Sequence, residues 1–195
     1  MSEPVLRIQA VEKRFGETHV LTGVDWEVPR GSVVGLLGRN GAGKTTLLKL
    51  ALGLLRRDRG EMELFGEDPW NLSDRSKARI GYVPQEYQPY PWMTSREVLN
   101  YTAAFYPGWN SLLVDQLLDR WHLNLNQTTK ELSPGQRQRV GLIAALGHEP
   151  DILLLDEPAA SLDPAARMVW RYEPERTRFK RRNGPTNHTK HGVLE

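Results

Sequence analysis

The apolar positions in the first half of the chain follow two different periods. Alternating apolar and polar residues predict strands, because one face of a half-buried strand is apolar. Such strands are expected near residues 5–8, 24–28 and 61–65, and short apolar runs at 32–37 and 80–83 predict two more. Residues 44–54 instead repeat leucine and alanine at helical spacing, which predicts an amphipathic helix directly after a glycine-rich segment.

Helical periodicity dominates the second half. Helices are expected from residue 95, around 112–118 and from 133, and Pro107-Gly108 separates the first two. The apolar run at 152–155 predicts a strand buried on both faces, as in a parallel sheet. This order of elements predicts an α/β domain with a mainly helical insert at about 86–132. After about Arg171 the periodicity fails.

Composition narrows the classes of function. The 195 residues include no cysteine, which excludes disulfide frameworks, thiolate metal sites and thiol catalysis. No apolar run reaches membrane-spanning length, and the start lacks the pattern of a secretory signal. The net charge of +2 comes from residues 165–195, which carry eight Lys or Arg against three Asp or Glu. The rest is slightly acidic, so charge gives no reason to expect a nucleic-acid partner.

The strongest chemical signal is a phosphate-binding loop of the form G-x-x-x-x-G-K-[ST]. It consists of Gly38, Arg39, Asn40, Gly41, Ala42, Gly43, Lys44, Thr45 and Thr46. Glycines let the loop aim backbone N–H groups inward, and the following helix adds the positive end of its dipole. Lys44 is expected to bridge the β- and γ-phosphates, and the Thr45 hydroxyl to ligate Mg²⁺.

A second signal is the acidic pair that ends the apolar run at 152–155. An acid at the carboxyl end of a parallel strand faces the edge where open α/β sheets bind ligands. Asp156 is expected to hold Mg²⁺, and Glu157 to polarise the attacking water as general base. Upstream, residues 132–136 read LSPGQ. Ser133 and Pro134 suit a plain capped helix start as well as they suit a functional motif.

These motifs, followed by Ser161-Leu162-Asp163, together resemble the nucleotide-binding subunit of an ABC transporter. LSPGQ is similar to the family signature LSGGQ, with proline at the third place. The resemblance spans about residues 5–167. It implies a P-loop NTPase core with a mainly parallel sheet, an N-terminal antiparallel β part and a helical insert. The predicted domain is 1–167, followed by an atypical basic tail at 168–195.

The resemblance implies roles for further residues. Gln85 matches the glutamine loop, which contacts Mg²⁺ or the attacking water. Phe15 matches the aromatic residue that stacks on adenine, and Asp163 matches a loop that communicates across a dimer. Two subunits of the family pair head to tail, each completing the partner's ATP site. The signature residues expected at the partner's nucleotide are Ser133, Gly135 and Gln136.

The function implied is that of an ATP-binding subunit that hydrolyses MgATP as a dimer and powers a separate permease. Such a subunit would be cytoplasmic and peripheral on the inner face of the membrane. The Phe-Tyr-Pro-x-Trp run within 101–110 resembles a branch of bacterial exporters, but an aromatic patch packing the insert explains it equally well. A soluble ABC-type ATPase of DNA repair or translation is the alternative. Those proteins usually carry coiled coils, zinc modules or a second ATPase core, none of which this sequence shows.

The tail departs from the family pattern, in which an amphipathic helix and an apolar strand lead to a switch histidine at the γ-phosphate. Here Pro174 would stop the helix early, and residues 176–182 are basic. No strand is predicted before His188 or His191, although both stand near the family's interval from Glu157. His188 is kept as a candidate, with an exposed tail histidine as the favoured interpretation. A reading-frame shift near residue 167 is our hypothesis for this tail. A naturally shortened variant is the other explanation, and loss of the switch region would favour a non-hydrolysing nucleotide-binding fragment.

Overall fold

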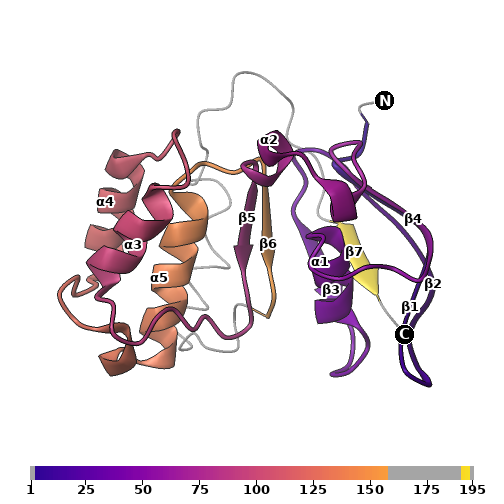
Figure 1. The fold of residues 1–195 in the computed structure, drawn as a ribbon, viewed down its shortest axis with the longest axis horizontal. Coiled ribbons are helices and arrows are strands. Elements are labelled where there is room, and N and C mark those ends of the chain that lie inside the picture. The colour runs from indigo at the N-terminus through magenta and orange to yellow at the C-terminus, as the bar shows by residue number, and fades with distance from the viewer. Residues whose placement is uncertain (1–2, 158–189, 194–195) are drawn as a thin grey trace. The chain divides into compact units, whose positions relative to one another are not determined.

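The computed structural model describes residues 3–157 and 190–193 of the chain (Figure 1). These residues form two compact units. The first unit comprises residues 3–77 together with 190–193, and the second comprises residues 78–157.

A three-stranded antiparallel sheet forms one part of the first unit (Figure 1). Its strands lie in the order β2 (Thr18–Val28), β1 (Leu6–Phe15) and β4 (Arg59–Leu64). The register between β1 and β2 shifts after Ile8, where Ala10 adopts a φ of 46° and donates its N–H to Asp25 Oδ1 at 2.8 Å. This bulge lets Ile8 and Val11 both reach the core although they are three residues apart.

The other part of the first unit contains the glycine-rich segment. Strand β3 (Val34–Leu37) leads into helix α1 (Lys44–Ala51), which buries Leu47, Leu50 and Ala51 and packs near β4 and the short helix η1 (Pro69–Asn71). Helix α2 (Asp74–Lys77) follows. These two short helices are not predicted by the periodicity, because three or four residues are too few to show a helical repeat.

Strand β7 (Lys190–Val193) corrects one expectation. The sequence pattern predicts no strand before His188 or His191, yet β7 contains His191 and pairs in parallel with β3, from Val34 opposite Lys190 to Leu37 opposite Val193. The backbone of His191 therefore lies opposite Gly35. The four residues Lys-His-Gly-Val carry no alternation, so their pairing depends on backbone groups that a hydrophobic pattern does not report.

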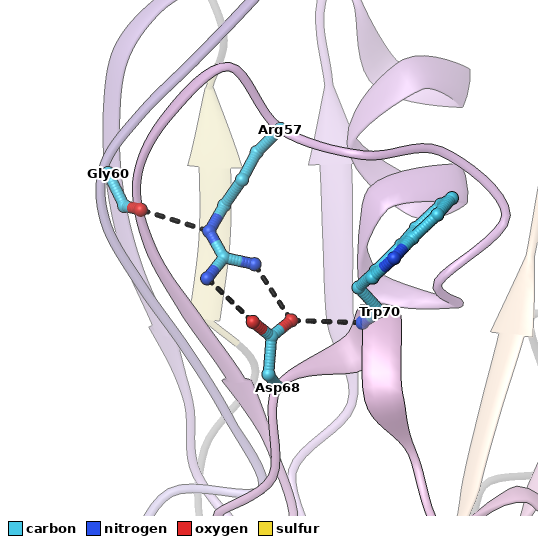
Figure 2. A network of polar contacts seen from close by, with 4 residues as sticks. All are labelled: Arg57, Gly60, Asp68 and Trp70. Atoms are coloured by element: carbon cyan, nitrogen blue, oxygen red, sulfur yellow. Dashed lines mark hydrogen bonds and ion pairs between the residues drawn. The ribbon is translucent and has the colours of Figure 1, made fainter.

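A polar network fixes the start of β4 to η1 (Figure 2). The Arg57 guanidinium donates to both Asp68 carboxylate oxygens at 2.8 and 2.9 Å, and its Nε donates to Gly60 O at 2.9 Å. Asp68 also caps η1 by accepting the Trp70 N–H. The hydrogen bond with Arg57 lowers the pKa of Asp68, and the same bond raises the pKa of Arg57. Residues of this network line an open cavity of about 200 Å³ that does not include the phosphate loop.

The second unit packs three helices beside a pair of parallel strands (Figure 1). Strands β5 (Ile80–Val83) and β6 (Ile152–Leu155) occupy the predicted residues and pair from Ile80 opposite Ile152 to Val83 opposite Leu155. Helix α5 (Pro134–Leu146) packs against β5 and against helices α3 (Ser95–Ala103) and α4 (Ser111–Trp121). The core between the helices contains Val98, Leu99, Val114, Leu118, Val140 and Ile143.

Local capping explains where these helices begin. Thr94 and Glu97 form a reciprocal capping box at α3, and Asn110 accepts the Leu113 N–H at the start of α4. The 3₁₀ helix η2 (Thr129–Glu131) lies between α4 and α5 and is again too short for the periodicity to predict. Within residues 3–157 and 190–193, no helix is long and apolar enough to cross a bilayer.

Candidate functional site

The glycine-rich loop between β3 and α1 owes its shape to two left-handed residues. Gly41 and Gly43 both have a φ of 85°, which side chains with a Cβ rarely adopt. A Cβ on Gly43 would also lie 2.7 Å from Leu21 Cδ2 and 3.1 Å from Val20 O. The end of the loop is therefore seated directly on β2, with no space for a larger residue.

Lys44 bends back over the start of this loop. Its ammonium donates to Gly38 O at 3.0 Å and Arg39 O at 3.1 Å. The described first turn of α1 contains no acidic side chain, and Gly43 O accepts the Leu47 N–H to begin the helix. A lysine ammonium beside a helix N-terminus and a glycine loop forms a cradle suited to a phosphate group.

Phe15 lies at the turn between β1 and β2 in the same unit. The residue is 49% exposed, and the Lys13 ammonium lies 5.4 Å from its ring centroid. Phe15 pairs with Thr18, and two residues further along β2 Val20 meets the position of a Cβ on Gly43. Strand β2 thus contacts both Phe15, through Thr18, and the end of the phosphate loop at Gly43, through Val20. The accessible face of Phe15 leaves room for a stacked base.

The second unit brings Gln85 and Glu157 together. Because β5 and β6 are parallel, their carboxyl ends lie at the same edge of the pair, and the residues that follow each strand meet there. Gln85 Nε2 donates to Glu157 Oε2 at 3.2 Å. Glu157 adopts a left-handed φ of 47°, a conformation that is uncommon for a residue with a Cβ.

Asp156 is only 2% exposed, and its N–H donates to Val83 O at 3.0 Å. Burial raises the pKa of Tyr82 on the adjacent strand, and the charge of Asp156 raises it further. A buried carboxylate at a strand end is a group that a cation would stabilise.

The residues expected to hold Mg²⁺ have suitable chemistry. Thr45 in the first unit offers a hydroxyl oxygen, and Gln85 and Asp156 in the second unit offer amide and carboxylate oxygens. Across the part of the chain that the structure describes, no three His, Cys, Asp or Glu side chains gather as a ready-made metal cage. Mg²⁺ usually keeps several waters and binds through one or two carboxylates and substrate phosphates, so each of these oxygens, taken within its own unit, is of a kind that suits this ion.

The LSPGQ segment forms a reciprocal capping box at the start of α5. Ser133 Oγ accepts the Gln136 N–H at 3.2 Å, and Gln136 Oε1 accepts the Ser133 N–H at 2.8 Å. Pro134 occupies the first helical position, where a missing N–H disturbs no helical hydrogen bond. The geometry is that of a capped helix start, and the same helix terminus presents the Gly135 N–H at a place where anions bind well.

Two residues near Gln85, namely Gln138 and Tyr87, were not predicted from the sequence. Gln138 is 1% exposed, donates to Pro84 O at 3.0 Å and accepts the Tyr87 N–H at 3.4 Å. Tyr87 lies with its ring against Gly141. The available signal was one glutamine at helical spacing from Leu142 and Ala145, on the face of α5 that the structure buries.

The Phe-Tyr-Pro-x-Trp run has two roles in packing. The Tyr106 ring stacks on His148 with centroids 3.9 Å apart, and the Trp109 indole covers Gly147, where a Cβ would lie 2.5 Å from it. These two residues fix the link between α3 and α4 to the end of α5. Phe105 is 64% exposed and belongs instead to a surface cluster. Asp163 and His188 lie outside the described residues.

The sequence that carries these features matches the model of a known protein family. The family model described as ABC transporter matches residues 21–160, which include the phosphate loop, Gln85, the LSPGQ segment and the acidic strand end. The chain belongs to the ABC transporter family of ATP-binding subunits. The predicted P-loop α/β fold, with its antiparallel N-terminal sheet and its parallel strands, is confirmed.

Named relatives agree with this family. The chain is 32% identical over 173 residues to an uncharacterized ABC transporter ATP-binding protein of Bacillus subtilis, covering 88% of this chain and 56% of that protein. It is 41% identical over 167 residues to the Nod factor export ATP-binding protein I of Burkholderia lata, covering 82% and 55%. The chain therefore spans somewhat more than half the length of these relatives.

Solved structures give the same result. An ATP-binding subunit of an ABC transporter superimposes with a TM-score of 0.76 at 28% identity, covering 85% of this chain and 71% of that one. A dimeric ATP-binding cassette in a post-hydrolysis state, bound to ADP and Pi, superimposes with a TM-score of 0.70 at 26% identity, covering 82% and 77%. Both solved proteins are described as ATP-binding, in agreement with the family model.

Proposed function

We propose that this chain binds MgATP and hydrolyses it as a head-to-tail dimer that drives a separate membrane permease. The phosphate loop carries the proposal. Its left-handed Gly41 and Gly43, the seat on β2 and the Lys44 ammonium above Gly38 form the cradle that a nucleotide phosphate requires. The dimeric relative with ADP and Pi supports the dimer and the hydrolysis.

Each described group would act through its own chemistry. Lys44 would exchange its two carbonyl contacts for phosphate oxygens, and the exposed ring of Phe15 would stack on the base. Thr45, Gln85 and Asp156 would hold Mg²⁺, which when bound supplies positive charge to the phosphates.

Glu157 would accept a proton from the attacking water at its carboxylate. The Gln85 amide, now 3.2 Å from that carboxylate, would orient the water as a donor or acceptor beside it. In the dimer, Ser133 and the Gly135 N–H would donate to the partner's γ-phosphate at the start of α5. Pro134 has no N–H, so it offers one donor fewer than a glycine would.

An exposed aromatic cluster supports a permease partner. In the second unit, Tyr90 lies 5.2 Å from Trp92 and 6.2 Å from Tyr101, and Tyr101 lies 5.1 Å from Phe105, measured between ring centroids. All four residues are at least 48% exposed. Exposed aromatic patches of this kind mark protein interfaces. We propose that this aromatic cluster binds the permease and so holds the chain at the inner face of the cell membrane. The system would be an exporter, like those for which several relatives are named.

The deciding experiment compares the native chain with Glu157→Gln, using the exposed Glu149→Gln as matched control. Loss of the base is expected to lower MgATP turnover about 10²- to 10⁴-fold while ATP binding stays near the native value. The control is expected to match the native chain. Phosphate release is measured with and without a candidate permease.

Three results would change the proposal. Failure of the native chain to bind ATP would refute it. Full turnover in Glu157→Gln would remove Glu157 as the base. A native chain that binds ATP but releases no phosphate, even with the permease, would support the second candidate, a non-hydrolysing nucleotide-binding fragment. That candidate is favoured by the departure of residues 168–195 from the family pattern.

A further inference from the structure

Gln138 is a polar side chain buried in the middle of α5 with two contacts to one distant loop. Its Nε2 donates to Pro84 O at 3.0 Å and its Oε1 accepts the Tyr87 N–H at 3.4 Å. These backbone groups lie on either side of Gln85, one residue before it and two residues after it. A buried amide is tolerated only where its donors and acceptors are matched, so both bonds are part of the fold.

A second contact from the same helix holds the same loop. The Tyr87 ring lies against Gly141, where a Cβ would be 2.6 Å from Tyr87 Cγ. Burial of this ring raises the pKa of Tyr87 to about 12, so the phenol stays neutral. Gly141 is three residues after Gln138 and therefore lies on the same side of α5. Helix α5 thus contacts the loop around Gln85 at two backbone groups and at the Tyr87 side chain.

Gln85 itself has no such support from burial. The residue is exposed, and the contact that the structure shows for its side chain is the 3.2 Å hydrogen bond to Glu157. An exposed side chain is only as well placed as the backbone that carries it. The pairing of β5 with β6 brings Gln85 near Glu157, and the two anchors on α5 hold the backbone on either side of Gln85.

We propose that Gln138 is a positioning residue of the glutamine loop, which clamps the backbone around Gln85 and so keeps its amide beside Glu157. The kinetic part of this inference rests on the proposed ATPase function. The structural part concerns the loop alone and holds whether or not the chain turns over ATP.

The first test is amide hydrogen exchange in the full chain. Gln138→Met keeps a similar length but removes both hydrogen bonds, and Gln116→Met on the exposed side of α4 is the matched control. The rate of amide exchange in a peptide covering residues 84–88 is expected to rise about tenfold or more, because the loop can then open without breaking the two hydrogen bonds of Gln138. Peptides from α3 and α4 are expected to be unchanged. Equal exchange of the loop in both variants would overturn the proposal, and so would a uniform rise throughout the second unit.

The second test is a double-mutant cycle on ATP turnover. Gln138→Met is expected to lower kcat about 10- to 100-fold, as a misplaced catalytic group does, with KM for ATP within about twofold. In a Gln85→Ala background the same substitution is expected to have no further effect, because the residue it positions is gone. Independent, multiplying effects would overturn the kinetic part.

A third variant covers failure of Gln138→Met to fold. Gln138→Asn keeps the amide but shortens the side chain by one methylene group, so that the amide can no longer reach both Pro84 O and the Tyr87 N–H. Its loop exchange is expected to lie between those of the native chain and of a fully released loop, and a native value would count against the clamp. If the native chain releases no phosphate, the proposed hydrolysis fails while the exchange experiment still decides the clamp.

Discussion

Gly43→Ala tests the seat of the phosphate loop. Two costs act on the new methyl group. The backbone must keep a φ of 85°, and the Cβ would lie 2.7 Å from Leu21 Cδ2. Leu21 is 2% exposed, so its side chain would have to move within the core, and Val20 O, 3.1 Å away, belongs to the backbone of β2. Relief of the contact with Val20 O therefore requires a shift of the β2 backbone.

Gly41→Ala is the matched control. Gly41 has the same φ of 85°, but among the described residues no heavy atom outside its own chain neighbours lies within 4 Å of a Cβ built there. Holding alanine in the left-handed region costs about 1–2 kcal/mol. Overpacking adds about 1–3 kcal/mol at Gly43 alone, so its total is about 2–5 kcal/mol.

The assay is urea unfolding followed by circular dichroism, together with titration of a fluorescent ATP analogue. Gly43→Ala is expected to lose about 1–3 kcal/mol more unfolding free energy than Gly41→Ala. ATP affinity is expected to fall in both variants, since both alter the loop that holds the phosphates. Equal losses of stability would refute the reasoning that the loop is seated on β2.

Three further expectations concern single side chains. Lys44→Ala is expected to weaken ATP binding about 10- to 100-fold in a titration, because it removes a charged phosphate donor, whereas Lys49→Ala in the last turn of α1 leaves affinity unchanged. Phe15→Ala is expected to weaken ATP binding about two- to tenfold while Phe15→Tyr keeps it, and equal affinities would exclude stacking. Burial lowers the pKa of His148 below 6.5, so the unfolded chain takes up the proton first. Unfolding free energy is therefore expected to fall as pH drops below about 6.5, and His148→Gln should flatten this slope in urea titrations.

Local patterns predicted the parts of the fold whose causes are local. Strands β5 and β6 are continuous apolar runs, and α3 and α5 begin at sequence caps, so their positions follow from neighbouring residues. Strand β1 extends well beyond the predicted segment, because the bulge at Ala10 breaks the alternation on which the prediction depends. Strand β2 also begins earlier than predicted, on the far side of Gly23, which has a φ of 94°. Strand β7 pairs through its backbone with a distant partner, which no local pattern records.

The site divides in the same way. The phosphate loop is one continuous motif with a strand before it and a helix after it, so the sequence alone predicts which residues form it. The contact between Gln85 and Glu157 joins residues 72 positions apart and depends on the pairing of β5 with β6. The role of Gln138 was not predicted, because a single glutamine in a helix is usually exposed and the sequence does not show that this one is buried.

Two glycines of α5, Gly141 inside the helix and Gly147 at its C-cap, have a consequence for how relatives of this chain can change. Glycine costs a helix about 1 kcal/mol relative to alanine, so Gly141 is a poor choice on propensity alone. The Tyr87 ring lies against Gly141 and leaves no space for the Cβ of an alanine there, and the Trp109 indole excludes a Cβ at Gly147 in the same way. Residue size at each glycine is thus coupled to the ring above it. In evolution, alanine can enter position 141 only after the ring at 87 shrinks or shifts, and aligned homologues should show the two positions varying together.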